Sequence, residues 1–365
     1  MALDETQTPV SLADYEREAE RSMVPGAHAY VVGGAGDEIT LRDNVAAWAR
    51  IAIRPRVLVG VGERDPRIDL LGVRRPHPLI IAPMAYQRMA DPDGEIAMAR
   101  AAAATGAVMS LSTLGTTSAP QLAEAVPDAP RWFQLYVFAD RGVSRELVAR
   151  AADNGYEALV VTVDLPVSGV RERDLRSGHL AAPAELVASA AAAGASGSLT
   201  PKQFTALIDP DLSWRDIERF ASESPLPVIL KGVLTPEDAV LAADHGARGV
   251  VVSNHGGRQL DTVLSGADAL PPIVDAIGDR LELMVDGGIR RGTDVLKALA
   301  LGARAVMVGR PALWGLAVGG SEGAQRVIEI LLAEFDSALA LSGARNARDI
   351  DRSLICPPPW AATSR

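Results

Sequence analysis

The chain contains 365 residues, of which 48% are hydrophobic, so it can bury a large core as one big domain or two ordinary ones. Its formal net charge of −10 and its pI of about 5.1 argue against nucleic acid and against anionic membrane surfaces as partners. An anion-binding site in such an acidic protein must therefore be a local cluster of arginine and lysine side chains.

The N-terminal segment MALDETQTPVSLADYE is acidic and lacks the basic region and apolar stretch of a signal peptide. No apolar run approaches the roughly 18 residues that a membrane span requires. The only cysteine, Cys356, excludes an internal disulfide and a multi-cysteine metal site, and it suits a reducing compartment. We expect a cytoplasmic protein without a membrane anchor or a metal site.

Residues 1–78 contain few long apolar runs, and the segment YEREAERSM (15–23) predicts a helix of an N-terminal cap. Eight short runs rich in Val, Ile and Leu follow. Runs this short and this continuously apolar are typical of strands buried on both faces, and hence of a parallel sheet. The predicted strands are residues 79–85, 107–113, 131–137, 158–164, 226–232, 249–255, 281–288 and 305–310.

Amphipathic segments between these runs end in glycine, which is the usual signal at a helix C-terminus. They include 94–106, 144–155, 235–246 and 292–302, and TPED at 235–238 fits a capping box. Eight alternations of strand and helix predict an α/β fold, a closed (β/α)8 TIM barrel over residues 79–345. The alternative, an open doubly wound sheet, is less consistent with eight similar units and with the lack of G-x-G-x-x-G after the first strand.

The interval between the fourth and fifth strands is more than twice as long as those before it. Its excess, an insertion at about 176–212, is dominated by Ala, Gly and Ser, which have little to bury. The composition predicts a long mobile loop after strand 4, either a lid over the barrel mouth or an ordinary disordered insertion. We expect residues 346–365 to form a C-terminal tail and the whole chain, 1–365, to be one domain.

Polar residues accumulate where the predicted strands end, and in such barrels the active site forms at the C-terminal ends of the strands. They are Ser112, Thr113, Gln134, Tyr136, Thr162, Asp164, Arg171, Lys231, Ser253, His255, Arg258, Asp286, Gly309 and Arg310.

Residue types divide this end of the barrel into three sub-sites. DGGIRRG (286–292) and GRP (309–311) offer bare backbone N–H groups with Arg290 and Arg310, which favours a phosphate. Lys231 lies in an apolar strand, where an ammonium needs an anionic partner. A flavin ring that gains negative charge on reduction would provide one, and a Schiff-base lysine is the alternative.

The third sub-site contains His255, Arg258 and Arg171. Two guanidinium groups can grip a carboxylate through paired hydrogen bonds, which would hold a 2-hydroxy acid in one pose. A neutral imidazole could then take a proton from it. Asp164 either orients the His255 ring or pairs with Arg171, and we favour the histidine.

With these motifs the chain resembles the FMN-dependent 2-hydroxy acid oxidase/dehydrogenase family, which includes glycolate oxidase, lactate oxidase, mandelate dehydrogenase and hydroxymandelate oxidase. The resemblance extends from about Tyr15 to Ile355. Its most specific segments are SNHGGRQLD (253–261) and DGGIRRGTDVLKALALGA (286–303), with RPRVL, APMAYQRMADPDGE, WFQLYV, TVDLPVSGVRERD and LKGVLTPEDA in support.

The resemblance implies His255 as the base, paired with Asp164, and Arg171 and Arg258 as ligands of the substrate carboxylate. It further implies that Lys231 stabilises reduced flavin and that Tyr30 and Tyr136 contact the substrate. The implied FMN contacts are Met84, Ala85, Ser112, Gln134, Thr162, Lys231, Ser253, Asp286, Gly287, Gly288, Arg290, Gly309 and Arg310. The insertion corresponds to the family's mobile fourth loop, without the basic apolar helix of its membrane-bound members.

Two positions bear on the substrate and the acceptor. Glycolate oxidase has a tryptophan where this chain has Leu114, so we expect a 2-hydroxy acid larger than glycolate, such as one resembling mandelate. Ala85 is typical of family oxidases, which favours O2 as acceptor and H2O2 as product. The resemblance also implies a homotetramer.

Three alternatives remain at this point. A dehydrogenase of the same family would pass electrons to another acceptor. A barrel of the inosinate dehydrogenase group would need a cysteine in a barrel loop, but Cys356 lies beyond the eighth strand. The third alternative is a non-catalytic barrel that binds a flavin or an acid.

Overall fold

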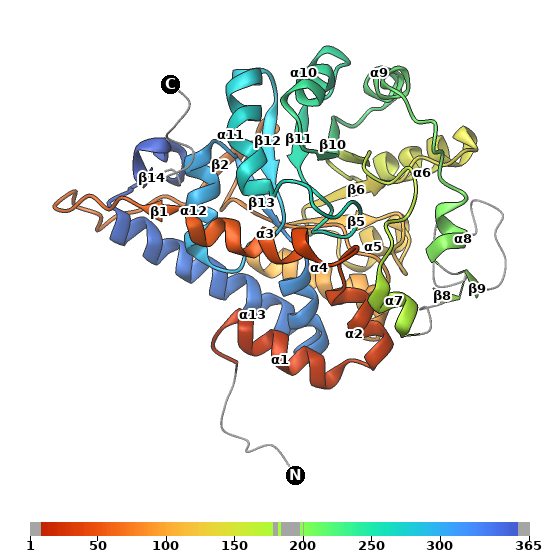
Figure 1. The fold of residues 1–365 in the computed structure, drawn as a ribbon, viewed down its shortest axis with the longest axis horizontal. Helices are drawn as coiled ribbons and strands as arrows, with labels where there is room; N and C mark the ends of the chain where they lie inside the picture. The colour runs from red at the N-terminus through yellow and green to blue at the C-terminus, as the bar shows by residue number, and fades with distance from the viewer. Residues whose placement is uncertain (1–8, 178–181, 184–197, 200, 357–365) are drawn as a thin grey trace, which may run out of the picture.

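The computed structural model describes residues 9–177, 182–183, 198–199 and 201–356. Eight parallel strands form a closed barrel in the order β10-β11-β12-β13-β4-β5-β6-β7, which confirms the predicted (β/α)8 fold (Figure 1). Closure occurs where β13 meets β4, with Met307 opposite Ile80, and where β10 meets β7, with Leu230 opposite Val161. The strands are β4 (Leu79–Ile81), β5 (Val108–Ser112), β6 (Arg131–Leu135), β7 (Leu159–Thr162), β10 (Val228–Val233), β11 (Gly249–Val252), β12 (Glu282–Val285) and β13 (Ala305–Val308).

Most strands end earlier than their apolar runs predicted. β4 ends at Ile81 instead of residue 85, and β11 ends at Val252 instead of residue 255. The backbone turns away after β11, since His255 has a left-handed φ of 59° that a strand cannot accommodate. Most of the polar residues at the strand ends therefore lie on loops at the C-terminal mouth of the barrel.

Helices cover the outside of the barrel and end as the glycine pattern predicted. Gly106 and Gly302 cap two of them in the left-handed conformation, and Thr235 accepts a hydrogen bond from the Asp238 N–H at the start of another. The helices are α4 (Gly94–Thr105), α5 (Ala119–Ala125), α6 (Arg141–Asp153), α9 (Trp214–Glu223), α10 (Pro236–Asp244), α11 (Gly266–Ile277), α12 (Gly292–Leu301) and α13 (Arg310–Ser342), with short 3-10 helices at Gln87–Met89, Gly278–Arg280, Ala347–Asp349 and Arg352–Leu354.

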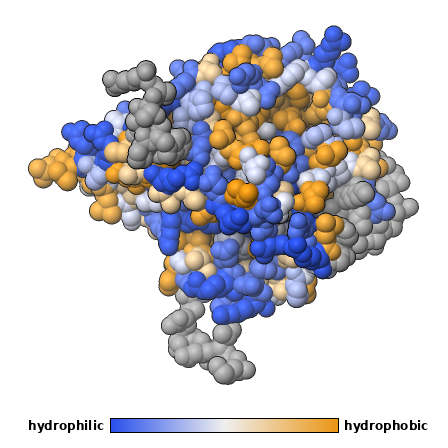
Figure 2. Space-filling model, in the orientation of Figure 1, coloured by the Kyte–Doolittle hydropathy of each residue, from blue (hydrophilic) through white to orange (hydrophobic). Residues whose placement is uncertain are grey.

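The N-terminal segment packs over the barrel. It contains α1 (Leu12–Ser22), α2 (Pro25–Val32), α3 (Ile39–Arg50), β1 (Ala52–Ile53), β2 (Ile68–Leu70) and β3 (Val73–Arg75). The expected helix at 15–23 coincides with α1, which packs against α13. The loop after β1 projects from the body (Figure 1) and has an apolar tip (Figure 2), where Val57 and Leu58 are 81% and 102% exposed.

Two expectations about loops need correction. Part of the insertion is packed, because Phe204 of α8 (Pro201–Thr205) contacts Phe138 edge-on and Ile208 forms a β-bridge with Phe138. Its other described elements are α7 (Glu172–Arg176), β8 (Ala182–Pro183) and β9 (Ser198–Leu199). The mobility predicted for 178–181, 184–197 and 200 falls outside the described residues.

The C-terminal tail begins later than predicted. β14 (Ile355–Cys356) pairs antiparallel with β1, which fixes the chain through residue 356. Residues 357–365 lie outside the described part of the chain. In the part that is described, no helix combines the length and the apolar character needed to cross a membrane.

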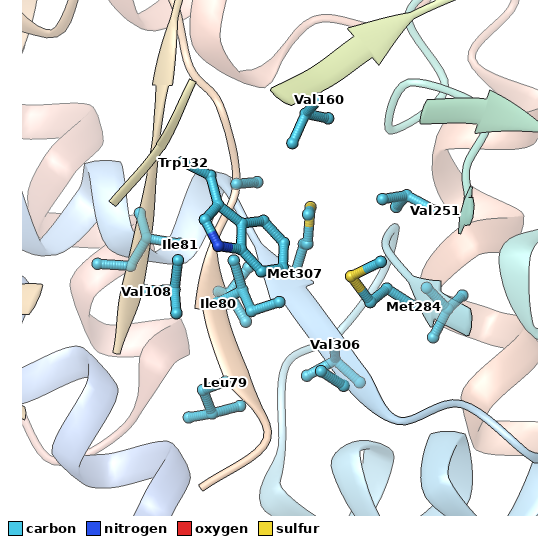
Figure 3. Close-up of a cluster of buried hydrophobic side chains, with 14 of the residues drawn as sticks. Leu79, Ile80, Ile81, Val108, Trp132, Val160, Val251, Met284, Val306 and Met307 are labelled. Atoms are coloured by element: carbon cyan, nitrogen blue, oxygen red, sulfur yellow. The ribbon is translucent and has the colours of Figure 1, made fainter. Parts of the chain in front are cut away.

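The barrel interior is filled by side chains, as Figure 3 shows for strands β4 to β7 and β11 to β13. Trp132, Met284 and Val160 are all fully buried there. Such a packed interior cannot serve as a pore, so ligand binding is confined to the mouth.

We predict that Trp132→Ala lowers the free energy of unfolding by about 3–5 kcal/mol, because it leaves a cavity the barrel cannot collapse to fill. Trp132→Phe should cost much less, since it keeps most of the ring, and the indole Nε1 has no hydrogen-bond partner among the described residues. Urea titrations measure both. A loss below about 1 kcal/mol for the alanine variant would contradict this account of the core.

Candidate active site

A cavity opens at the C-terminal ends of the barrel strands and is bounded by α2 of the N-terminal segment. Most of the side chains predicted to form the site line it. They are Tyr30, Met84, Ala85, Ser112, Leu114, Tyr136, Thr162, Arg171, Lys231, His255, Arg258, Asp286, Gly287, Gly288, Arg290, Gly309 and Arg310.

Three predicted residues, Gln134, Ser253 and Asp164, lie behind the cavity wall. The Gln134 amide accepts from the Ser112 hydroxyl at 3.0 Å and donates to the Thr162 hydroxyl at 2.9 Å. Ser253 accepts hydrogen bonds from the Lys231 ammonium and from the His255 N–H. Gln134 and Ser253 therefore fix residues of the wall from behind.

His255 is held by contacts at both ring nitrogens. Its Nδ1 lies 2.9 Å from Asp164 Oδ1, and its Nε2 lies 3.4 Å from the Tyr136 hydroxyl. The Tyr136 and His255 rings are nearly parallel, with an interplanar angle of 12°. Burial opposes ionisation of Asp164, but the interaction and hydrogen bond with His255, together with the charge of Lys231, outweigh it and lower the pKa of Asp164. The arrangement leaves Nε2 as the ring nitrogen available to a ligand.

Arg171 pairs with a carboxylate that the sequence analysis did not consider. Its Nε donates to Asp174 Oδ2 at 2.7 Å, while Asp164 is bonded to His255. Of the two pairings weighed for Asp164, the structure therefore contains the one with histidine.

Arg258 and Arg310 are half-buried against the C-terminal end of α2. Arg258 donates to the carbonyls of Tyr30 and Gly33, and Arg310 donates to those of Val31 and Gly33. The last carbonyls of a helix lack partners within it and carry the negative end of its dipole, so they suit guanidinium groups.

The backbone carbonyls compensate the positive charges of Arg258 and Arg310 only in part. Within the described ranges, neither Arg258 nor Arg310 forms an ion pair with a carboxylate. Burial, followed by repulsion from Arg258 and Arg290, lowers the pKa of Arg310 to about 9. An anionic ligand would offset this repulsion between the cations.

Arg290 lies beside the glycine-rich turn after β12. It donates to the Ile289 carbonyl and stacks over the Trp314 ring at 4.8 Å. A Cβ on Gly288 would approach the Asn44 carbonyl oxygen to 1.8 Å, so this turn needs glycine to pass under α3. The backbone of Gly288 and the guanidinium of Arg290 thus lie at the same end of the cavity.

Lys231 forms a buried ion pair with Asp286, with 2.8 Å between Nζ and Oδ2. Burial disfavours the ammonium, but Asp286 and Asp164 outweigh this and raise the pKa of Lys231. A Schiff base requires a neutral amine, so these neighbours argue against that role. Asp286 Oδ1 is buried and has no partner in the described part of the protein.

Sequence reasoning missed several residues of the site. Asp174 could have been found from its spacing of three residues from Arg171. Asn44 gave no such signal, although its amide exchanges two hydrogen bonds with Asn254 next to His255. Val31, Leu165 and Phe204 line the cavity but belong to no polar motif.

Comparison with known proteins gives one consistent result. A family model described as FMN-dependent dehydrogenase matches residues 19–357. L-lactate oxidase of Nostoc sp. is 47% identical over 360 residues, 95% of this chain and 98% of that protein. 2-Hydroxyacid oxidase 1 of Homo sapiens is 43% identical, covering 97% and 98%. The crystal structure of mandelate oxidase with benzoyl-formic acid is 42% identical, with a TM-score of 0.85 and coverage of 93% and 97%.

We predict that Gly256→Ala weakens FMN binding. Gly256 has a φ of 64°, and a Cβ there would lie 2.9 Å from Arg310 Nη1. Left-handed backbone costs an alanine about 1–2 kcal/mol, and relaxation of the loop should raise the dissociation constant of FMN roughly five- to thirtyfold. Flavin fluorescence titration measures it. Gly26→Ala in α2, where a Cβ meets nothing within 4 Å, is the control and should bind FMN normally.

Proposed function

Because the chain belongs to the FMN-dependent dehydrogenase family, we propose that it oxidises an (S)-2-hydroxy acid to the 2-oxo acid and that the electrons pass to O2, giving H2O2. One observation carries the proposal. His255, backed by Asp164, lines the same cavity as two arginines, Arg171 and Arg258, that can bind a carboxylate.

The cavity residues fit FMN. The guanidiniums of Arg290 and Arg310 and the bare backbone of Gly288 and Gly309 suit a phosphate. The unpaired Oδ1 of Asp286 can accept from a hydroxyl such as those of the ribityl chain. The Lys231 ammonium can stabilise negative charge on the flavin ring. When bound, FMN supplies a two-electron acceptor.

The arginines and Tyr30 would hold the substrate carboxylate. The Tyr30 ring lies 5.9 Å from the Arg171 guanidinium and 4.8 Å from that of Arg258. Cation–π contacts of this kind restrict both guanidinium groups next to the same ring. A carboxylate held there is presented to the remaining residues in a single orientation.

His255 and Tyr136 would act on the substrate hydroxyl region. Burial, reinforced by the charge of Asp164, raises the pKa of the Tyr136 phenol, so it stays a neutral hydrogen-bond donor. His255 Nε2, next to that hydroxyl, accepts a proton from the substrate. Asp164 receives the Nδ1–H bond and stabilises the imidazolium that results.

The size of the substrate follows from Leu114, which lines the cavity where glycolate oxidase carries tryptophan. The smaller side chain leaves room for a substituent on the substrate, so we propose a 2-hydroxy acid larger than glycolate, of the lactate or mandelate type. A cavity wall of Leu114, Ala85 and Leu165 is suited to an apolar substituent.

The proposal extends to assembly and location. We propose a single-domain protomer that forms a cytoplasmic homotetramer, as the family resemblance implies. The exposed apolar side chains of Val57 and Leu58 are available for contact with another copy.

Each alternative function differs from the proposed oxidase in one feature. A dehydrogenase of the same family differs only in its electron acceptor. Inosinate dehydrogenase chemistry is disfavoured because no cysteine is among the described residues that line the cavity, and Cys356 lies in β14. A non-catalytic binder would not need the pairing of His255 with Asp164.

We predict that the FMN-loaded protein loses its yellow colour when an (S)-2-hydroxy acid is added without air, and regains it with production of H2O2 when air is admitted. His255→Ala should keep bound FMN but bleach about 10²- to 10⁴-fold more slowly, since the proton acceptor is lost. Stopped-flow absorbance over glycolate, lactate, mandelate and longer acids measures both. Near-normal bleaching of the variant would end the assignment of His255, and no bleaching with any acid would favour a binder.

We predict that Leu114→Trp shifts specificity towards small substrates. The larger ring fills the space next to the substrate substituent. Overpacking costs about 1–3 kcal/mol of free energy, which corresponds to roughly a ten- to hundredfold loss of kcat/KM for mandelate relative to glycolate. Steady-state rates with both acids measure the ratio. Leu341→Trp, at a side chain that is 79% exposed, should leave it unchanged. An unchanged ratio in the Leu114 variant would remove this residue from substrate selection.

A further inference from the structure

Asp174 is a buried carboxylate directly behind Arg171, on the short helix α7. Its side chain is 9% exposed, and that of Arg171 is 10% exposed. The bond between them uses Arg171 Nε and Asp174 Oδ2. It therefore holds the guanidinium by its inner edge, and both Nη nitrogens have no hydrogen-bond partner within the described chain.

The ion pair between Asp174 and Arg171 offsets the repulsion between two neighbouring cations, Arg171 and Arg258. Arg171 and Arg258 both lie over the Tyr30 ring. Burial and then repulsion from Arg171 lower the pKa of Arg258, and Asp174 opposes that shift. Without the carboxylate, repulsion from Arg258 would push the Arg171 guanidinium away from it.

Asp174 is itself held in place by the N-terminal segment. Its neighbour Arg173 donates two hydrogen bonds to Glu38, which precedes α3. Glu38 in turn accepts from the Gly34 N–H, just after α2. The carboxylate that restrains Arg171 is thus anchored to the same segment whose carbonyls bind Arg258.

We propose that Asp174 is a positioning residue for carboxylate recognition, which keeps the Nη edge of Arg171 facing the cavity beside Arg258. The inference rests on the proposed function, because it takes the ligand to be the carboxylate of a 2-hydroxy acid. Asp174 does not touch that ligand and acts only through Arg171. Burying a carboxylate whose Oδ1 has no partner among the described residues is costly, and orientation of Arg171 is the gain.

The sign of the effect separates this role from simple electrostatics. Loss of the Asp174 charge leaves the cavity more positive, which by itself would tighten anion binding. Loss of the restraint on Arg171 weakens it. A positioning role therefore predicts weaker binding when Asp174 is replaced.

The test is titration of oxalate into FMN-loaded protein, followed by flavin absorbance. Asp174→Ala should raise the dissociation constant of oxalate about ten- to hundredfold, the range expected for a hydrogen bond between charged groups. Asp174→Asn, which keeps an acceptor oxygen without the charge, should fall between it and the unmodified protein. If the alanine variant does not fold, the asparagine variant decides: weaker binding supports the proposal, and unchanged or tighter binding overturns it.

Two controls make the test specific. Glu172→Gln removes the same charge from α7, but among the described residues Glu172 pairs only with the exposed Arg176, so oxalate affinity should not change. In an Arg171→Met background, which has no cation for Asp174 to hold, Asp174→Ala should add little. Additive effects of the two substitutions would overturn the proposal.

Turnover provides a separate readout. Asp174→Ala should raise KM for the 2-hydroxy acid more than it lowers kcat, and a fall in kcat at constant KM would contradict a positioning role. If no 2-hydroxy acid bleaches the unmodified protein, the proposed function fails, while the oxalate titration still tests Asp174. If the unmodified protein binds no oxalate, the positioning proposal fails.

Discussion

The site depends on the contact between two half-buried guanidinium groups and the carbonyl end of helix α2. Arg258, in the loop after β11, and Arg310, at the start of α13, are 52 residues apart in the chain, yet both donate to the Gly33 carbonyl. Carbonyl dipoles hold the two cations together without neutralising them, in a protein whose net charge is −10. The cavity therefore keeps a local positive charge that carboxylates of the surrounding surface do not cancel, and this charge suits anionic ligands such as a phosphate and a carboxylate.

This contact makes the N-terminal segment part of the site. The Trp48 indole donates to the Gly287 carbonyl, and Lys297 of α12 donates to the Trp48 carbonyl, so α3 is tied to the turn after β12. Asn44 bonds to Asn254 in the loop that carries His255. A barrel without this segment would lose the acceptors for two arginines and the support of two glycine-rich loops. The N-terminal segment and the barrel therefore form the site together.

Local sequence signals predicted the barrel because each β/α unit carries its own evidence, an apolar run followed by a helix that ends in glycine. The residues of the cavity followed from strand ends and from family motifs. Features that depend on distant pairing escaped prediction. The pairing of β1 with β14 joins residues about 300 positions apart, and Asn44 contacts Asn254 without any motif around it. The apolar runs overestimated the lengths of the strands, because hydrophobic residues continue into the loops that follow. The loop after β4 is an example, since its residues line the cavity instead of extending the strand.

The loop after β11 shows how these demands are reconciled. His255 adopts a left-handed backbone, which costs a residue with a side chain about 1–2 kcal/mol. Glycine would relieve that strain but would remove the imidazole, so the strain is retained where the chemistry requires a ring. The next two positions are glycines for a steric reason: a Cβ on Gly257 would approach the Leu41 backbone to 2.7 Å. The Gly257 carbonyl also accepts from the Ala35 N–H. The loop therefore lies between strand β11 and the N-terminal segment. The packing that holds α2 against the arginines also maintains the backbone conformation of this loop. That conformation directs His255 Nε2 towards the Tyr136 hydroxyl.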